Sequence, residues 1–84
     1  MKHVGSARFW ALLEALPAEV RAVAEKNYEL LKSNPRHPSL QFKRIGPLWS
    51  VRVGLRYRAL GRDMAGSVLW FWIGSHDDDD KLVG

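Results

Sequence analysis

Residues 49–59, Trp-Ser-Val-Arg-Val-Gly-Leu-Arg-Tyr-Arg-Ala, hold two short runs of alternating apolar and polar side chains, separated by a glycine. A period of two is typical of β-strands, and Gly54-Leu55 marks a reversal of the chain. The stretch therefore predicts a β-hairpin. Its apolar side chains would face one side of the sheet, and Arg52, Arg56 and Arg58 would face the other.

The same pattern extends on both sides of this hairpin. Before it, Leu40 and Phe42 alternate with polar residues up to Lys43, and Gly46-Pro47 then supplies a turn. After it, the run Ser67–Gly74 is apolar on both faces, which is usual for a strand in the interior of a sheet. Strict alternation divides this last run into two sets, Val68, Trp70 and Trp72 on one face and Leu69, Phe71 and Ile73 on the other. We predict a three- to four-stranded antiparallel sheet.

The first third of the chain has the helical period instead. Two stripes with i, i+3, i+4, i+7 spacing are present, made by Phe9, Leu12, Leu13 and Leu16 and by Val20, Val23, Ala24, Asn27, Tyr28 and Leu31. Ser6 is a suitable N-cap, Pro17 separates the helices, and Asn34-Pro35 ends the second. The fold class is α+β: residues 1–84 form one domain, in which an N-terminal helical hairpin packs on one face of the sheet and a short C-terminal helix or tail follows.

Composition excludes several classes of protein. The 84 residues include no cysteine, which excludes disulfide scaffolds, thiol nucleophiles and cysteine-ligated zinc. The longest apolar run, Val68–Ile73, is far shorter than the roughly 20 residues of a membrane-spanning helix. We expect a soluble, cytoplasmic protein without a membrane partner.

The net charge of +4 is unevenly distributed. The segment from Arg36 to Arg62 contains no acid and seven basic residues, Arg36, Lys43, Arg44, Arg52, Arg56, Arg58 and Arg62. If the helices cover the apolar face, Arg52, Arg56 and Arg58 gather on the open face, joined by Lys43 or Arg44. Guanidinium groups suit phosphate oxygens, so this pattern favours a polyanionic partner such as nucleic acid. The alternative is a cationic surface that discourages strand addition.

The end of the last predicted strand carries His76, followed by the acidic run Asp77–Asp80. A histidine beside a basic face could transfer protons near neutral pH. His3 and His37 are expected at the surface, and the spacing of the three histidines does not fit a zinc site. Four consecutive aspartates cannot all reach one ion, so the run is expected to be solvated. We expect neither metal nor cofactor.

Several segments together resemble one branch of the RelE/ParE superfamily, the small toxins of bacterial type II toxin–antitoxin pairs. They are Phe9-Trp10, Asn34–Lys43, Trp49–Val53, Tyr57–Gly61 and Trp70–His76. The resemblance implies two helices on an antiparallel sheet. It also implies either metal-independent cleavage of messenger RNA, often on the ribosome, or inhibition of DNA gyrase. A cognate antitoxin would neutralise either activity.

The resemblance assigns roles by position. Arg58 matches the arginine that contacts the scissile phosphate, and His76 falls near the acid–base position after the last strand. Arg52 would stabilise charge beside Arg58, while Lys43, Arg44 and Arg56 would bind the RNA backbone. One departure is Asp79, which stands where this branch usually has a tyrosine. Gyrase inhibition, and a non-toxic interaction module that uses the basic face, remain alternatives at this stage.

Overall fold

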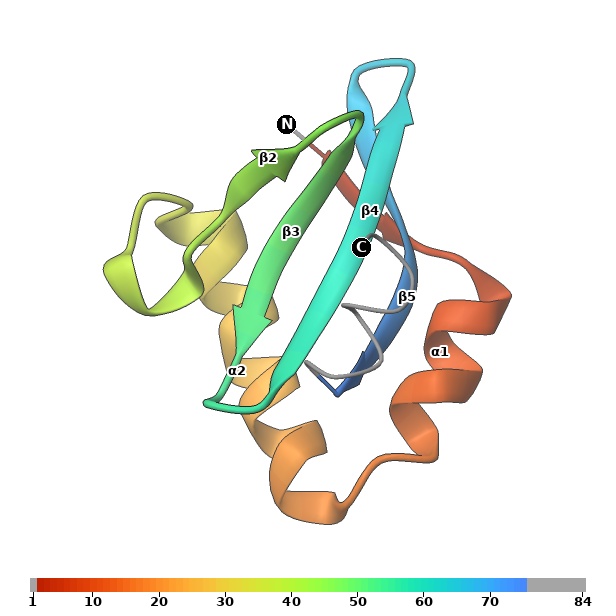
Figure 1. The fold of residues 1–84 in the computed structure, drawn as a ribbon, viewed down its shortest axis with the longest axis vertical. Coiled ribbons are helices and arrows are strands. Elements are labelled where there is room, and N and C mark those ends of the chain that lie inside the picture. Colours follow the sequence, from red (N-terminus) through yellow and green to blue (C-terminus); the bar gives the residue numbers. More distant parts are fainter. Residues whose placement is uncertain (1, 76–84) are drawn as a thin grey trace.

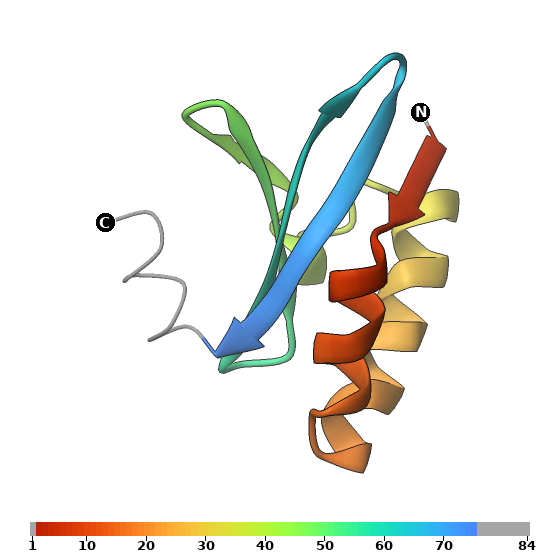
Figure 2. The same ribbon diagram turned by 90° about the vertical axis from the view of Figure 1, so that its right-hand side faces the viewer.

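The computed structural model describes residues 2–75, which form two helices and a five-stranded sheet. The sheet order is β1-β5-β4-β3-β2, and the helices lie side by side on one of its faces (Figure 1, Figure 2). The α+β class with a helical hairpin is confirmed. In chain order the elements are β1 (Lys2–Gly5), α1 (Ala7–Glu14), α2 (Ala18–Ser33), the 3₁₀ helix η1 (Pro38–Leu40), β2 (Lys43–Ile45), β3 (Leu48–Val53), β4 (Tyr57–Met64) and β5 (Ser67–Ser75).

Both helices begin and end where local chemistry predicts. The Ser6 side chain caps α1 by accepting a hydrogen bond from the Phe9 amide at 3.1 Å, and Pro17 precedes α2. Each predicted stripe buries one leucine, Leu13 in α1 and Leu31 in α2. The first helix packs mainly on β5 and the second on β3. The hairpin therefore covers one face of the sheet, and no helix among residues 2–75 covers the other (Figure 2).

The antiparallel sheet predicted from the sequence does not include the edge strand β1. Lys2–Gly5 forms β1, which pairs in parallel with Ser67–Trp70 of β5. The sheet is therefore mixed, with five strands instead of three or four. Because β1 occupies the outer edge of β5, the strand that is apolar on both faces is indeed an interior strand.

The strand predicted around Leu40 and Phe42 begins later than expected. The His37 ring caps η1 by accepting a hydrogen bond from the Ser39 amide at 3.2 Å, and Leu40 is fully buried at the end of this turn. Gln41 then adopts a left-handed conformation, with φ of 44°. This conformation breaks the extended chain, so β2 starts only at Lys43.

A bulge corrects the predicted division of β5 into two faces. Leu60 of β4 pairs with Trp72, but its neighbour Gly61 pairs with Trp70, so Phe71 is the extra residue. The bulge moves Trp70 and Trp72 to opposite faces. Trp70 joins the core beneath the helices, while Trp72 lies beside Leu60 on the face away from them. Ile73, predicted opposite Trp70, belongs to the same core.

His3, expected at the surface, instead fastens β1 to the core. Its Nδ1 accepts a hydrogen bond from the Trp70 indole at 3.1 Å, and the two rings stack with centroids 6.0 Å apart. The His3 carbonyl accepts a further bond from the Tyr28 hydroxyl of α2 at 3.2 Å. Burial lowers the pKa of His3 below its ordinary value of 6.5, and the positive charge of Lys32 lowers it further.

This lowered pKa predicts a loss of stability in mild acid. Below about pH 6.5 the unfolded chain protonates His3 more readily than the folded one, so unfolding becomes easier as pH falls; above it the ring is neutral in both states. Thermal unfolding at pH 7.5, 6.5 and 5.5 should show a steeper decline for the wild type than for His3→Gln, which lacks the titrating ring. Equal slopes for both proteins would contradict this role of His3.

Candidate phosphate-binding site

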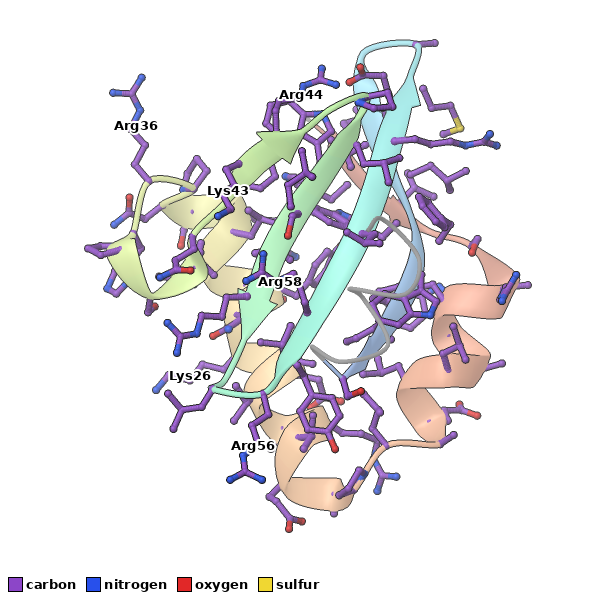
Figure 3. All side chains as sticks on the ribbon, viewed as in Figure 1. Lys26, Arg36, Lys43, Arg44, Arg56 and Arg58 are labelled. Atoms are coloured by element: carbon purple, nitrogen blue, oxygen red, sulfur yellow. The ribbon has the colours of Figure 1, made fainter. Side chains whose placement is uncertain are left out.

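Strand register gathers three of the predicted basic residues on the face of the sheet that the helices leave uncovered. Residues directly opposite one another in antiparallel strands point to the same side. One row across the sheet consists of Lys43, Ser50, Leu60 and Trp72, and the next consists of Arg52, Arg58 and Gly74. Lys43 and Arg58 project from this face in Figure 3. We call the surface formed by Lys43, Ser50, Arg52, Arg58 and Trp72 the basic face.

Arg58 lies at the centre of the basic face and is partly buried there. Its Nη1 donates a hydrogen bond to the Ser50 hydroxyl at 3.3 Å, and Ser50 itself is fully buried. Opposite Arg58, Gly74 leaves room for the Trp72 ring: a Cβ at Gly74 would lie 2.6 Å from it. Arg58 thus contacts the Ser50 hydroxyl, and the Trp72 ring lies over the glycine that pairs with Arg58.

Arg52 is held through its inner nitrogen. Its Nε donates to the Gly54 carbonyl at 2.8 Å, and its own carbonyl accepts a bond from the Asn27 amide group at 3.0 Å. Within residues 2–75, neither Arg52 nor the exposed Lys43 forms an ion pair. Among the described residues, no carboxylate pairs with the outer nitrogens of Arg52 or with the Lys43 ammonium, so both cations suit an anion.

Arg44 lies on the opposite face, which settles the choice between Lys43 and Arg44 that the sequence left open. Its guanidinium stacks over the Trp49 ring at 4.2 Å and pairs with Asp63 at 2.7 Å. Asp63 also accepts a bond from the Trp49 indole at 3.0 Å. This indole bond first, and the Arg44 bond second, hold the pKa of Asp63 below its usual value. Arg44 is thus engaged by a carboxylate.

Of the predicted site residues not yet described, Arg56 lies outside the basic face. Arg56 belongs to the turn between β3 and β4 and points away from Lys43 at the far end of the sheet (Figure 3). His76, the acidic run Asp77–Asp80 with the substituted Asp79, and the predicted C-terminal helix or tail lie outside the described residues. The structure thus brings Lys43, Arg52 and Arg58 together and separates Arg44 and Arg56 from them.

The carboxylates of the described chain are segregated from the basic face. All four glutamates lie on α1 or α2, on the other side of the sheet. Asp63 pairs in register with the core residue Val68, so it also faces the helix side. Within residues 2–75 the basic face therefore carries positive charge without a carboxylate among its members, an arrangement that attracts anions.

Sequence reasoning overlooked two members of this face. Ser50 alternates with Trp49 and Val51, so the period of two already placed it beside Arg52, but a lone serine gives no further signal. Trp72 could not be placed, because only the bulge at Phe71 brings it to the basic face. Residues 2–75 include no cluster of three or more potential metal ligands, and no helix among them has the length and apolarity to span a membrane.

Comparison with solved structures shows a shared fold. The RelB–RelE antitoxin–toxin complex from Methanococcus jannaschii matches with a TM-score of 0.71 and 16% identity, over 96% of this chain and 99% of that one. A YoeB/ParE toxin from Agrobacterium tumefaciens matches with a TM-score of 0.68 and 18% identity, over 90% and 99%. YafQ from E. coli matches with a TM-score of 0.69 and 13% identity, over 99% and 98%.

Comparison of sequences identifies the family. No curated protein matches the chain, but the family model of the ParE-like toxin domain matches residues 18–78. This range contains α2 and strands β2 to β5, including every member of the basic face. The match covers well over half of the sequence, so the chain belongs to the ParE-like toxin domain family, within the RelE/ParE superfamily of toxins from toxin–antitoxin systems.

Proposed function

We propose that this toxin is a metal-independent endoribonuclease that cleaves messenger RNA and is neutralised by a cognate antitoxin. The observation that carries the proposal is the basic face, where Lys43, Arg52 and Arg58 lie together on the side of the sheet away from α1 and α2, without a carboxylate among its members. Such a surface suits the phosphate backbone of RNA. Because the proposed substrate is messenger RNA, on or off the ribosome, the proposed place of action is the cytoplasm.

Arg58 is assigned to the scissile phosphate. The 2′-hydroxyl of the RNA attacks the adjacent phosphorus, a 2′,3′-cyclic phosphate forms, and the bond to the 5′-oxygen breaks. Negative charge builds up on the phosphate oxygens in the transition state, where a preorganised cation contributes most. The Ser50 hydroxyl holds one guanidinium nitrogen of Arg58 and leaves the charge of the group intact.

The other cations bind the substrate. Arg52 lies beside Arg58 in the same row and would share the developing charge, while Lys43 in the neighbouring row holds the backbone. Arg44, engaged by Asp63, and Arg56, at the far end, have no part in this step. His76 is assigned proton transfer, taking the proton from the 2′-hydroxyl or giving one to the leaving 5′-oxygen.

The chemistry of the products tests the proposal. Purified toxin is incubated with messenger bound to ribosomes and, separately, with free RNA in EDTA. We expect cleaved RNA with a 2′,3′-cyclic phosphate and a 5′-hydroxyl end, and no cleavage where the scissile nucleotide carries 2′-deoxyribose. Cleavage of the 2′-deoxy substrate would overturn the mechanism. Cleavage of free RNA only after metal is added would overturn it as well.

A gyrase assay distinguishes the alternative that the family allows. The toxin is added to purified DNA gyrase and relaxed plasmid. We expect supercoiling to continue, since the basic face is assigned to RNA. Loss of supercoiling together with intact messenger would reject the ribonuclease and support gyrase inhibition instead.

Ser50 is a positioning residue for Arg58 in this scheme. Ser50→Ala removes the hydroxyl that the Arg58 guanidinium binds, while the small side chain still fits the fully buried position. We expect kcat to fall several-fold with KM and thermal stability little changed, because the lost contact aligns a group that acts in the transition state. Ser50→Thr keeps a hydroxyl and should therefore recover part of the lost kcat. An unchanged kcat in Ser50→Ala would show that Ser50 does not position Arg58.

A further inference from the structure

A hollow lies beside the basic face, where the edge of the sheet meets α2 and η1. β2 pairs only with Leu48–Ser50, so among the described residues no strand covers the outer edge of Val51–Val53. Asn27 of α2 takes that place by donating a hydrogen bond to the Arg52 carbonyl at 3.0 Å. The hollow has a volume of about 580 Å³, within the range of roughly 300–1,000 Å³ that is usual for small-ligand sites. It is therefore large enough for one nucleotide.

Three side chains with nitrogen donors line this hollow, and they come from three different elements. Lys26 belongs to α2, His37 caps η1, and Arg52 belongs to β3. Figure 3 shows the Lys26 side chain directed outward from the molecule. No carboxylate is among the described residues that line the hollow, and neither Lys26 nor Arg52 forms an ion pair with a described residue. The hollow therefore favours an anion.

The η1 turn determines which nitrogen of His37 carries the proton. Nδ1 accepts a hydrogen bond from the Ser39 amide at 3.2 Å, and a backbone amide can only donate. The Ser39 hydroxyl lies 2.8 Å from the same nitrogen and therefore donates to it as well. Because Nδ1 is an acceptor, the proton of the neutral ring is on Nε2. His37 thus offers a ligand in the hollow an N–H donor at Nε2.

The basic face and the hollow meet at Arg52, which belongs to both. Arg52 pairs in register with Arg58, and residues that oppose one another in antiparallel strands have Cα atoms about 4.5–5.5 Å apart. An RNA strand whose scissile phosphate lies at Arg58 can therefore continue past Arg52 and bring a neighbouring phosphate to Lys26 and His37. Apolar side chains that suit the base or ribose of that nucleotide complete the lining: Val23, Leu30 and Leu55.

We propose that this hollow is a second nucleotide subsite of the toxin, which binds an RNA phosphate next to the scissile one. The inference rests on the proposed ribonuclease function and adds the path of the substrate. Lys26 and Arg52 supply positive charge, and the Nε2–H group of His37 supplies a directed hydrogen bond. Contacts to phosphate fix the register of a nucleic acid and carry no sequence information. The subsite therefore affects KM, and it does so for any base.

Binding of a hexanucleotide made only of 2′-deoxyribose, which this chemistry cannot cleave, tests the subsite at several salt concentrations. Lys26→Gln removes one charge from the hollow. We expect it to weaken binding about 3- to 10-fold and to lower the slope of log K against log salt by about 0.7, the value for one phosphate contact on a single strand. The control is Lys32→Gln, the same change on α2 at a lysine that pairs with Glu29 and is not among the residues that line the hollow. Its affinity should stay within about twofold of the wild type.

His37→Asn tests the hydrogen bond separately from the charge. An asparagine oxygen can still cap η1 in place of Nδ1, so thermal stability should be unchanged, but no atom remains at the position of Nε2. We expect hexanucleotide binding to weaken about 3- to 10-fold, as for the loss of one hydrogen bond, with the salt slope unchanged. His37→Asp keeps the same cap and adds a negative charge, so it should weaken binding further.

A cleavage assay reports the same subsite through KM. Lys26→Gln and His37→Asn should raise KM and leave kcat within about twofold of the wild type, because the subsite holds the RNA equally in the ground state and the transition state. A fall in kcat with unchanged hexanucleotide affinity would overturn the proposal and assign the altered residue to the reaction itself.

The binding outcomes separate this proposal from the function on which it rests. Equal hexanucleotide affinity of the wild type and both variants, or no binding by the wild type, would overturn the subsite. An equal loss in Lys32→Gln and Lys26→Gln would overturn it too, since net charge alone would explain the effect. Weaker binding by the two variants of a protein that cuts no RNA would support the subsite and reject only the ribonuclease.

Discussion

Replacing Arg58 by alanine should reduce RNA cleavage about 10²- to 10³-fold and abolish growth arrest on induction. The magnitude is typical for the loss of one preorganised group that stabilises transition-state charge. Arg58 is the only basic residue of the face that lies in the middle strand of the sheet and is held by a buried hydroxyl. Its loss removes positive charge from the position assigned to the scissile phosphate, and Arg52 and Lys43 lie at other positions on the face and cannot replace it.

The control for this prediction is Arg8→Ala, the same change at an exposed arginine of α1 on the other side of the sheet. Cleavage by this variant should match the wild type. Arg58→Lys keeps the charge but loses the planar guanidinium, so we expect it to recover only part of the rate. Circular dichroism should show an intact fold for all three proteins. Unaltered cleavage by a folded Arg58→Ala would remove Arg58 from the site.

Trp70→Ala should cost about 3–5 kcal/mol of the free energy of unfolding. Trp70 is 3% exposed, packs in the core beneath the helices, and donates its indole hydrogen to His3. A domain of this size has only about 5–15 kcal/mol in total. Each lost kcal/mol lowers Tm by roughly 4–8 °C, so much of the variant should be unfolded near physiological temperature.

Thermal and urea unfolding measure this loss against Leu55→Ala, which changes a side chain that is 85% exposed. The control should unfold within about 0.5 kcal/mol of the wild type. A Trp70→Ala protein as stable as Leu55→Ala would mean that the core does not depend on the contacts between β5, His3 and the helices.

The sequence predicted the elements that are determined by neighbouring residues, through helix caps, prolines and the period of apolar side chains. Ser6, Pro17 and the two apolar stripes located the helices, and alternation in residues 49–59 located the central hairpin with Arg52 and Arg58 on one face. The strand Lys2–Gly5 was missed because four residues carry too little pattern, and its partner lies at the other end of the sequence. Pairings over such a distance leave no local signal.

The candidate site was only partly predictable for a related reason. Which of Lys43 and Arg44 reaches the basic face depends on the register of β2 against β3. Two adjacent cations in the sequence do not reveal this register. Trp72 moved to that face through a single extra residue, Phe71, which strict alternation cannot represent. The role of His76 stays a prediction, because this residue lies outside the described residues.

The parallel pairing of β1 with β5 also bears on how the protein is made. Lys2 lies opposite Ser67, so β1 pairs with a strand that is synthesised only after α1, α2 and β2 to β4. Contacts between such distant parts of a chain are slow to form, because a long loop must close before they contribute. The β1–β5 edge therefore cannot form before translation has passed Trp70, and a nascent chain that stops earlier lacks both this edge and the strand that places Gly74 opposite Arg58.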